Sequence, residues 1–505
     1  MESDLSRASN KPSYVDVHPE SDWPAPASYT YPDANNDSVD DWYGKPIFTP
    51  DQAADQLNRG GGGWDIGPKG IITYTFLDKA PSGHYNTKHG ESFAGLGSYT
   101  AGFAPFTEAQ RAATRDAIDL WDDLIAPTFV EKNGRGGADI SYMNTNTGPG
   151  QAAAFVPWKD KYDAFSPSYN RFDKIQGDTF VNQDQGDNFD LAPGGYGFTT
   201  LVHETGHAIG LQHPGDYNAG QVFSYPASAE YFQDTAQFTI MSYFDAGWSG
   251  ATGYINWVTG FYQSAQTPMI HDIYAVQQMY GADLTTRTGN TTYGFNSNAD
   301  RDVFDFDINT NPFLAIYDAG GHDTLDFSGW TVDSVLNLND GEFSSGYGQE
   351  VNAAELNAMY GTNFTQAFWE ALFAGKTNNP GFLSDNISIA YGTVIEDGVT
   401  GSGNDVLIGN EVANRLDGGA GQDTYTGGAG KDIFVVQHVG NFDILTDFNS
   451  GEDKLDLSAF GIDSSDLTFS ADGKTLFGDV NGDGAADFAV LSQSDAILVS
   501  DIIFG

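Results

Sequence analysis

Three histidines and one glutamate stand close together in the chain, at spacings that suit metal chemistry. His203 and His207 are four residues apart, so on a helix they share one face and can offer imidazole nitrogens to one cation. Glu204 is their neighbour rather than a further ligand, and its carboxylate can reach a metal-bound water as a general base. Gly210 permits the left-handed turn that ends a helix and swings His213 back as a third ligand.

Three protein ligands leave one coordination position open for water, which distinguishes a catalytic zinc site from a structural one. The alternative is a surface helix that happens to carry three histidines. The chain has only 9 histidines in 505 residues, so five fixed positions would match by chance on the order of one time in a hundred thousand. We therefore predict one catalytic zinc ion.

Composition excludes several classes of partner. Lys plus Arg number 22 against 69 for Asp plus Glu, and the resulting net charge of -47 repels nucleic acid and anionic membranes. The chain has no cysteine, so zinc must be held by nitrogen and oxygen atoms. No apolar run approaches the roughly eighteen residues of a membrane span. We expect neither nucleic-acid binding nor membrane insertion.

The elements that must position the histidines follow from caps and apolar spacing. In chain order we predict a helix over 50–58, a strand over 71–76, a helix starting at the capping box of Thr107 and Gln110, short strands over 138–142 and 152–156, the zinc helix over 197–209, and a helix over 270–280. On the last helix Ile273, Val276 and Tyr280 share one face. We therefore expect His271 on the exposed side, and not as a ligand.

Changes in amino-acid composition along the chain predict three regions. Residues 1–45 form a flexible N-terminal segment, which is either a removable propeptide or a disordered tail. Residues 46–283 carry the zinc motif. Residues 284–505 consist of short β-type runs punctuated by Gly, Asn and Asp, interrupted at 349–385 by an insertion with a helical patch at 364–374. We assign no function to the insertion.

Between residues 400 and 435 a glycine-rich nonapeptide repeats in phase, although the unit at 409–417 lacks its Gly-x-Asp pair. The glycines make a tight turn that presents carbonyls and one Asp carboxylate, while a large apolar residue points inward. Turns of successive coils can sandwich Ca²⁺, which favours oxygen ligands. A flexible linker would not repeat Asp and the apolar residue in phase. The predicted calcium-binding residues are Gly401, Gly403, Asp405, Gly418, Gly419, Gly421, Asp423, Gly428, Gly430 and Asp432.

A second aspartate-rich stretch, at 479–487, is similar to the start of an EF-hand loop. Position twelve of that loop would be Val490 instead of the bidentate glutamate that such a site needs. We therefore predict a polar hairpin turn there.

The zinc motif, the stretch Thr239-Ile240-Met241-Ser242-Tyr243 and the nonapeptide repeats together resemble the serralysin family, secreted bacterial zinc endopeptidases of the metzincin group. The resemblance runs from about Pro46 to the end and includes 213–218, 280–289, 293–298 and 318–329. It implies an α+β fold: a metzincin zinc-protease domain with a mixed twisted sheet and helices, followed by an all-β parallel β-roll that binds several structural calcium ions.

The resemblance also implies roles for single residues. His203, His207 and His213 would bind zinc, Glu204 would be the general base, and Met241 would form a turn beneath the ligands. Tyr243 would ligate the metal at rest and stabilise the oxyanion during turnover; the alternative is an ordinary core tyrosine. The strand at 152–156 would pair with an extended substrate. Further calcium ligands would be Arg287, Gly289, Asp318, Gly320, Gly321, Asp323 and Glu396, although the neighbouring 393–394 pair is transposed relative to the family.

The C-terminal residues 497–505 end in an acidic residue followed by apolar ones. Family members carry such a tail as an uncleaved signal for one-step export by a type I (ABC) secretion machinery, which would explain the missing N-terminal signal; the alternative is a plain terminal β-strand. Extracellular calcium would then neutralise the acidic roll and drive its folding.

We therefore expect a secreted monomer that hydrolyses internal peptide bonds of extended polypeptides. One alternative is an extracellular calcium-dependent adhesion or structural protein with a vestigial protease domain. A zinc hydrolase acting on a non-peptide bond is a further alternative, which the edge strand does not favour.

Overall fold

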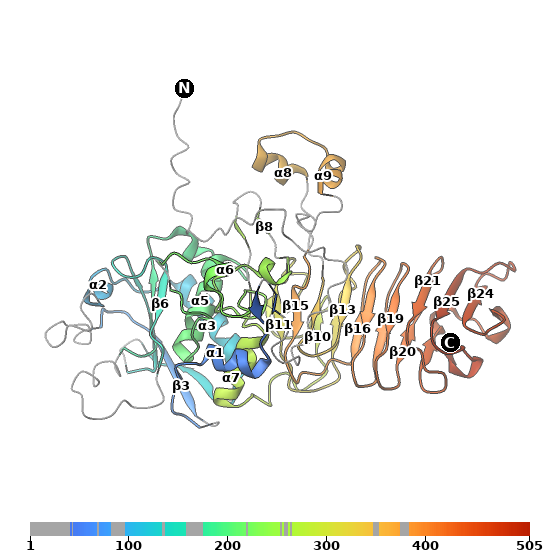
Figure 1. The fold of residues 1–505 in the computed structure, drawn as a ribbon, viewed down its shortest axis with the longest axis horizontal. Coiled ribbons are helices and arrows are strands. Elements are labelled where there is room, and N and C mark those ends of the chain that lie inside the picture. The colour runs from blue at the N-terminus through green and yellow to red at the C-terminus, as the bar shows by residue number, and fades with distance from the viewer. Residues whose placement is uncertain are drawn as a thin grey trace.

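A computed structural model shows two halves, a mixed α/β half with the zinc motif and an elongated β half (Figure 1). The structure describes residues 41–42, 44–67, 70–81, 96–133, 137–157, 175–218, 221–252, 255–256, 261–262, 265–346, 353–373 and 383–505. The N-terminal segment predicted at 1–45 lies almost wholly outside these residues. Among them, no helix is both long and apolar enough to cross a membrane.

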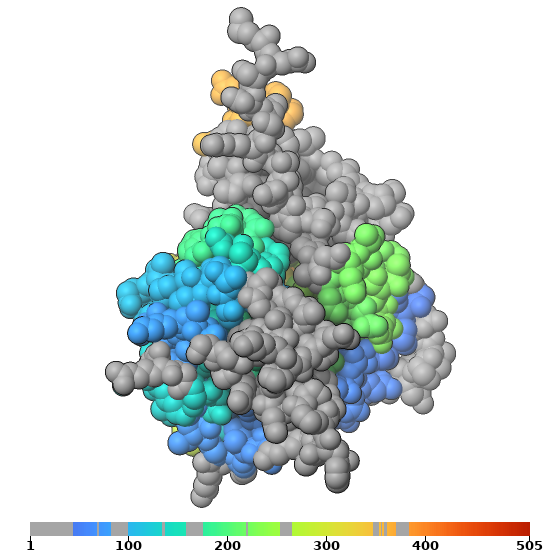
Figure 2. All heavy atoms as spheres, turned by 90° about the vertical axis from the view of Figure 1, so that its left-hand side faces the viewer, coloured from blue at the N-terminus to red at the C-terminus, as the bar shows by residue number. Residues whose placement is uncertain are grey.

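The first half is built on a five-stranded sheet in the order β4-β3-β5-β7-β6. Its strands are β3 (Ile71–Phe76), β4 (Thr128–Glu131), β5 (Ile140–Thr145), β6 (Ala152–Ala154) and β7 (Asp178–Asn182). All neighbours are parallel except β6, which pairs antiparallel with β7 and forms one edge. Figure 2 shows the surface of this half that lies opposite the roll. Segments from the first part of the chain and from its middle part lie together on this surface.

Helices supply the rest of this half. They are α1 (Pro50–Leu57), α2 (Leu96–Ala101), α3 (Glu108–Asp122), α5 (Tyr196–Ile209), α6 (Tyr225–Ser228) and α7 (Ile270–Tyr280). The predicted capping box is present: Gln110 N donates to Thr107 Oγ1 at 3.2 Å, and Thr107 N donates to Gln110 Oε1 at 3.0 Å. Helix α3 packs against α5, and Trp121 Nε1 donates to the Val202 carbonyl at 3.1 Å.

The expected exposure of His271 is wrong. This residue lies on α7 as predicted, but only 1% of it is exposed. Its ring lies 5.1 Å from the ring of Phe238 and is stacked at 6.4 Å on Tyr391, which belongs to the β half. Packing between the halves covers the face of α7 that the helix pattern alone leaves free. Burial lowers the pKa of His271 to about 3, so it is neutral at physiological pH.

The second half is a parallel β-roll, as predicted. One seven-stranded sheet, β10-β12-β16-β18-β20-β22-β26, is parallel throughout, and the other has the order β13-β17-β19-β21-β25-β24-β23. The first sheet contains β10 (Thr292–Gly294), β12 (Thr324–Asp326), β16 (Asp397–Val399), β18 (Arg415–Asp417), β20 (Ile433–Val435), β22 (Lys454–Asp456) and β26 (Ile502–Ile503).

The second sheet contains β13 (Val335–Asn337), β17 (Val406–Ile408), β19 (Thr424–Thr426), β21 (Phe442–Leu445), β23 (Leu467–Phe469), β24 (Thr475–Gly478) and β25 (Phe488–Ser492). A three-stranded sheet of β11 (Leu314–Ile316), β15 (Ile387–Ile389) and β14 (Phe343–Ser344) lies near the junction of the halves. Short strand pairs complete the fold: β1 (Asp41–Trp42) with β2 (Lys45–Pro46), and β8 (Ile255–Asn256) with β9 (Phe261–Tyr262).

Strand register explains the spacing of the repeat. Leu407 pairs with Tyr425 in one sheet and Leu416 with Phe434 in the other, so two nonapeptides make one coil. All four side chains are at most 1% exposed and fill the space between the sheets. The degenerate unit at 409–417 still forms a strand because Leu416 keeps the inward apolar position.

Three further predictions concern the edges of the roll. The insertion contains α8 (Ala353–Tyr360) and α9 (Gln366–Phe373), which lie outside the sheets (Figure 1). The stretch at 479–487 is the predicted polar hairpin turn, linking β24 to β25, and the Asp479 carboxylate accepts backbone N–H groups from Gly482 and Gly484. The chain ends in β26, which pairs with β22.

A partly buried ion-pair network joins the two halves. Arg287 donates to Asp123 at 2.8 Å and to the carbonyl of Tyr317 at 2.8 Å, while Arg301 donates to Asp123 at 2.8 Å and to Asp119 at 3.0 Å. Burial alone would raise the pKa of Asp123, but the two guanidinium groups lower it below its usual range. The network ties the end of α3, and through α3 the zinc-motif helix, to the start of the roll.

Replacing Arg287 with Met should lower the free energy of unfolding by about 2 kcal/mol, because Asp123 loses one charged hydrogen bond and keeps only those from Arg301. Urea unfolding of the calcium-loaded protein would measure the change. Arg115→Met is the matched control, since its pair with Glu131 leaves side chains 39% and 37% exposed and should contribute about 0–1 kcal/mol. Equal losses in the two variants would contradict the prediction.

Candidate metal centre

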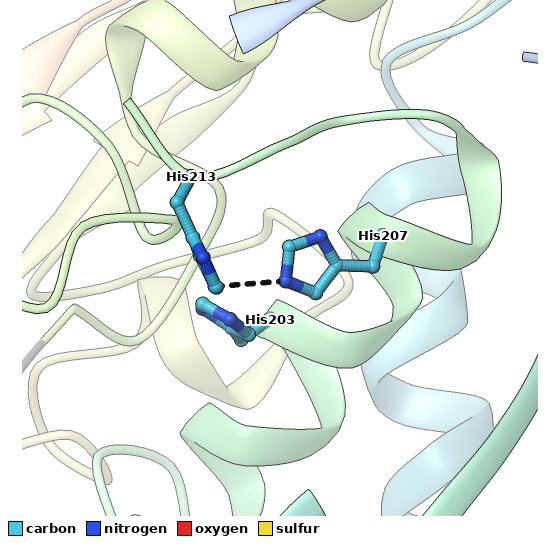
Figure 3. A group of neighbouring side chains, drawn as sticks. All are labelled: His203, His207 and His213. Carbon is cyan, nitrogen blue, oxygen red and sulfur yellow. Dashed lines mark hydrogen bonds between the residues drawn. The ribbon is translucent and has the colours of Figure 1, made fainter. Parts of the chain in front are cut away.

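Helix α5 and the turn that ends it bring the three predicted histidines together (Figure 3). His203 and His207 lie on one face of the helix. Gly210 ends it with φ +123°, and a side chain there would also meet the Gly63 nitrogen at 2.7 Å. The chain therefore reverses at a position that only glycine suits, and His213 returns toward the helix.

The hydrogen bonds of the three rings set which nitrogen carries the proton. His203 Nδ1 lies 2.8 Å from the Ile240 carbonyl, His207 Nδ1 2.8 Å from that of Leu211, and His213 Nδ1 2.9 Å from that of Tyr217. A carbonyl only accepts, so each Nδ1 must donate, and in a neutral ring the Nε2 atom then presents a lone pair. His207 Nε2 and His213 Nε2 face each other at 3.0 Å (Figure 3).

This arrangement fits a metal ion. Two facing lone pairs repel each other unless a cation lies between them, and tetrahedral zinc holds nitrogens at about 2.0–2.1 Å. Burial lowers the pKa of His203 to about 4 and that of His207 to about 3, and it places the pKa of His213 well below its usual value. The rings are thus neutral, ready to bind a cation. Over the part of the chain described, no other three His, Cys, Asp or Glu side chains converge in this way.

Glu204 meets the requirements of a base beside the metal. It is 6% exposed, its Oε2 atom has no hydrogen-bond partner, and its carboxylate accepts the backbone N–H of Ala154 on edge strand β6. Burial raises its pKa to about 8; a nearby cation would favour the ionised form and lower this value. A buried oxygen without a partner is costly, and such an atom can accept a proton from a group that enters the cavity.

A cavity of about 250 Å³ opens beside these groups. His203, Glu204 and Tyr243 lie on its wall together with Ala152 of the edge strand. Its apolar surface comes from Ala236, Ile240, Phe244 and Ala265. The strand predicted to pair with substrate is thus an edge strand whose end borders the cavity.

Met241 and Tyr243 lie where the motif predicts. Met241 is fully buried against α5, since a side chain at Gly206 would come 2.7 Å from its sulfur and 3.1 Å from the ring of Trp121. The ring of Tyr243 lies 4.3 Å from that of His213, measured between centroids, and 5.8 Å from that of His203. Tyr243 therefore borders the space enclosed by the imidazoles.

One supporting residue was missed from the sequence. Asp272, fully buried on α7, accepts hydrogen bonds from Thr239 Oγ1 at 2.6 Å, from Ile240 N at 2.7 Å and from Met269 N at 2.9 Å. The carbonyl of Ile240 in turn accepts from His203. Asp272 thus fixes the backbone N–H of the residue whose carbonyl orients a candidate ligand, and burial raises the pKa of Asp272 to about 7. Nothing in its spacing along the chain signals this role.

In the roll, carboxylates form ladders from coil to coil. Asp405 Oδ1 accepts the N–H of Ser334 at 2.6 Å, Asp423 Oδ1 that of Asp405 at 2.9 Å, and Asp443 Oδ1 that of Asp423 at 3.1 Å. The Oδ2 atoms of Asp405 and Asp423 are buried without a partner. Such atoms fit a hard cation, which favours carboxylate oxygens. The sequence prediction did not include Asp443.

The other edge of the roll is similar but interrupted. Asp432 Oδ1 accepts the N–H of Asn414 at 2.9 Å, and Asp453 Oδ1 accepts that of Asp432 at 3.0 Å. Asn414 stands where the degenerate repeat lacks its aspartate, and its amide nitrogen donates to the carbonyl of Glu396 at 2.9 Å. This edge therefore has one carboxylate fewer for a cation.

Several positions of the repeat require glycine because the backbones of neighbouring coils lie too close together there for a side chain. A Cβ at Gly419 would lie 2.0 Å from the carbonyl oxygen of Gly401, and one at Gly421 would lie 1.7 Å from that of Gly403. Gly428 and Gly430 similarly approach the carbonyls of Asn410 and Val412, whereas Gly418 N donates to Tyr425 Oη at 3.0 Å. Carbonyl oxygens of neighbouring coils thus crowd the same turns as the carboxylates.

The first predicted calcium loop is also assembled. Gly321 lies against the carbonyl of Gly289, Asp323 N donates to Glu396 at 2.7 Å, and Asp323 Oδ2 is buried without a partner. Arg287 has φ +47°, and Gly320 has φ +135° with its N–H bonded to Asp318 at 2.8 Å. Asp318 also accepts from Tyr293 at 2.7 Å, so both its oxygens already have partners.

Comparisons with known proteins agree across both halves. Residues 282–359 and 359–483 match the family described as Peptidase M10 serralysin C terminal, and residues 106–252 match Metallo-peptidase family M12B Reprolysin-like. Metalloprotease AprA of Pseudomonas entomophila (strain L48) is 35% identical over 504 residues, covering 91% of each chain. Serralysin of Photorhabdus luminescens is 36% identical over 438 residues, covering 81% of this chain and 76% of that one. Serralysin G of Dickeya chrysanthemi is 33% identical over 451 residues, covering 84% and 81%.

Removing the Asp272 carboxylate by substitution with Ala should weaken zinc binding by about 10–100-fold, because Ile240, whose carbonyl orients His203, loses the anchor of its N–H. Competition with a fluorescent zinc chelator measures the dissociation constant. Asp51→Ala is a suitable control, since Asp51 is exposed and bonds Tyr274 of the same helix α7. Unchanged zinc affinity in a folded Asp272→Ala variant would contradict the supporting role of Asp272.

Proposed function

The chain belongs to the serralysin family of zinc metalloendopeptidases, and on that premise we propose that His203, His207 and His213 hold one catalytic zinc ion for the hydrolysis of internal peptide bonds. The observation that carries the proposal is the joint geometry of the cavity. Three neutral imidazoles face one point, and a carboxylate with an unpaired oxygen lies beside them.

The bound zinc would supply a Lewis acid for the scissile carbonyl and would lower the pKa of a water toward neutrality. Glu204 accepts the proton of that water through its unpaired oxygen and then delivers it to the leaving amine. Tyr243 donates to the developing oxyanion, an effect worth about 3 kcal/mol by comparison with other oxyanion donors. The N–H of Ala154 donates to Glu204 and so holds the base beside strand β6, which would receive the substrate.

An extended polypeptide suits this site better than a compact substrate. Strand β6 is an edge, so a substrate strand laid alongside can pair with it, apart from the Ala154 N–H that bonds Glu204. A side chain of that substrate would enter the cavity of about 250 Å³ next to Glu204. The proposed substrates are therefore extended segments of extracellular proteins.

We further propose that several structural calcium ions complete the roll. The unpaired oxygens of Asp323, Asp405 and Asp423 and the crowded glycine carbonyls support this assignment. Residues 497–505 would act as the signal for a type I (ABC) exporter, and calcium would fold the roll after export. The chain would then act as a monomer.

Substituting Glu204 with Gln should lower proteolysis of casein by at least about 10²-fold while zinc stays bound, because only the proton acceptor is lost. A casein gel and a metal assay on the same preparation test both parts. Glu230→Gln, at an exposed position outside the cavity, is the control and should keep full activity. Full proteolysis by the Glu204→Gln variant would refute the assigned base.

Calcium binding should depend on pH. Burial is the first cause that raises the pKa of Asp423 to about 8, of Asp432 to about 7 and of Asp405 to about 6 in the calcium-free roll. Because the folded-state pKa values of these aspartates are raised, the calcium-free roll loses stability as the pH rises from the ordinary aspartate pKa to these raised values. At neutral pH some of these carboxyls still hold a proton, which calcium must displace in order to bind.

We therefore expect calcium affinity to fall as pH drops from about 8 to 6, with proton release on calcium addition near pH 7. Isothermal titration in two buffers of different ionisation enthalpy measures the released protons. An affinity that does not change across this range would exclude these carboxylates as ligands.

A further inference from the structure

Asp234 is a further buried carboxyl group near the candidate centre. It is not part of the zinc motif, and the mechanism proposed above gives it no role. Asp234 is fully buried, and its Oδ1 atom accepts hydrogen bonds from Tyr217 Oη at 2.7 Å and from Ser242 Oγ at 2.8 Å. Its Oδ2 atom is buried without a partner. Burial raises the pKa of Asp234 to about 7; among charged groups, Glu230 raises this pKa and Lys45 lowers it.

Both hydroxyl donors are neighbours of Tyr243. The ring of Tyr217 lies 5.3 Å from that of Tyr243 and is stacked at 5.5 Å on His213. Ser242 directly precedes Tyr243, and its Oγ atom accepts the backbone N–H of Phe244 at 3.0 Å. One carboxylate oxygen therefore holds the ring that packs on Tyr243 and the hydroxyl that braces the backbone on both sides of it.

A purely structural role does not account for this choice of partners. An isolated buried carboxylate is costly, and a well-packed apolar residue of similar size generally serves stability at least as well. Departures of this kind concentrate at functional sites, where a precise position matters more than stability. Although the Tyr217 ring also stacks on His213, the hydrogen bond that orients His213 is to the main-chain carbonyl of Tyr217, which does not depend on the hydroxyl. The position that Asp234 controls is therefore that of Tyr243.

We propose that Asp234 is a positioning residue, which holds the phenol of Tyr243 beside the metal through the hydroxyls of Tyr217 and Ser242. The proposal rests on the proposed function of Tyr243. It predicts that loss of the acceptor impairs turnover without releasing the metal, because the three imidazoles keep their own hydrogen bonds.

The test compares Asp234→Ala with Asp234→Asn, whose side-chain oxygen can still accept both hydroxyls. In Asp234→Ala we expect kcat on a quenched peptide to fall about 10–100-fold, with KM and the zinc dissociation constant within about threefold of wild type. In the Cu²⁺-substituted protein, the phenolate-to-copper charge-transfer band should be lost. Asp234→Asn should retain the band and at least about half of kcat.

Several outcomes would overturn the proposal. These are an unchanged kcat and charge-transfer band in Asp234→Ala, a zinc affinity that falls in parallel with kcat, or an equal loss in Asp234→Asn. If Asp234→Ala does not fold, Ser242→Ala and Tyr217→Phe each remove one hydroxyl and should each weaken the band; an unchanged band in both would overturn the proposal.

Wild-type measurements separate this inference from the proposed function. A wild-type protein without zinc-dependent proteolysis would refute the function itself. An active wild-type protein without the copper band would refute the placement of Tyr243 at the metal, and the role of Asp234 with it. Tyr231→Phe is the matched control, because Tyr231 is buried near Asp234 and its hydroxyl has no partner among the described residues.

Discussion

The whole centre depends on three hydrogen bonds from imidazole Nδ1 atoms to backbone carbonyls. These bonds direct the Nε2 lone pairs of His203, His207 and His213 toward one point, where only a cation relieves their repulsion. The accepting carbonyls belong to Ile240, Leu211 and Tyr217, so the turn after α5 and the segment around Met241 must be in place before the site exists.

Buried acids stabilise those supporting segments. Asp272 accepts the N–H of Ile240, and Asp234 accepts the hydroxyls of Tyr217 and Ser242, which are neighbours of Tyr243. Both carboxyls have pKa values raised to about 7 by burial, so the site gives up some stability for fixed geometry. Glu204 follows the same logic, because a carboxylate with a partner for each oxygen would be a poorer proton acceptor.

The acidic β half poses the opposite electrostatic problem. The net charge of -47 over the whole chain disfavours a compact state, and in this half the ladders place carboxylates of successive coils one above another. Calcium between the turns would convert this repulsion into attraction. The Arg287 network connects the roll to the other half. Asp123, which Arg287 bonds, caps the end of α3, and α3 packs on the helix that carries two of the histidines.

Local patterns were enough to predict the convergence of the three histidines, the capping box at Thr107, the inward apolar position of the repeat and the hairpin at 479–487, since each depends on residues near one another in the chain. The role of Glu204 as the base stays a prediction. The region boundaries, the export signal and the calcium stoichiometry stay predictions. Only tertiary structure decided that His271 is buried, that Asp272 and Asp234 support the centre, and that Asp443 and Asp453 extend the ladders. Burial depends on what the other half covers, and these hydrogen bonds join segments whose spacing along the chain carries no periodic signal.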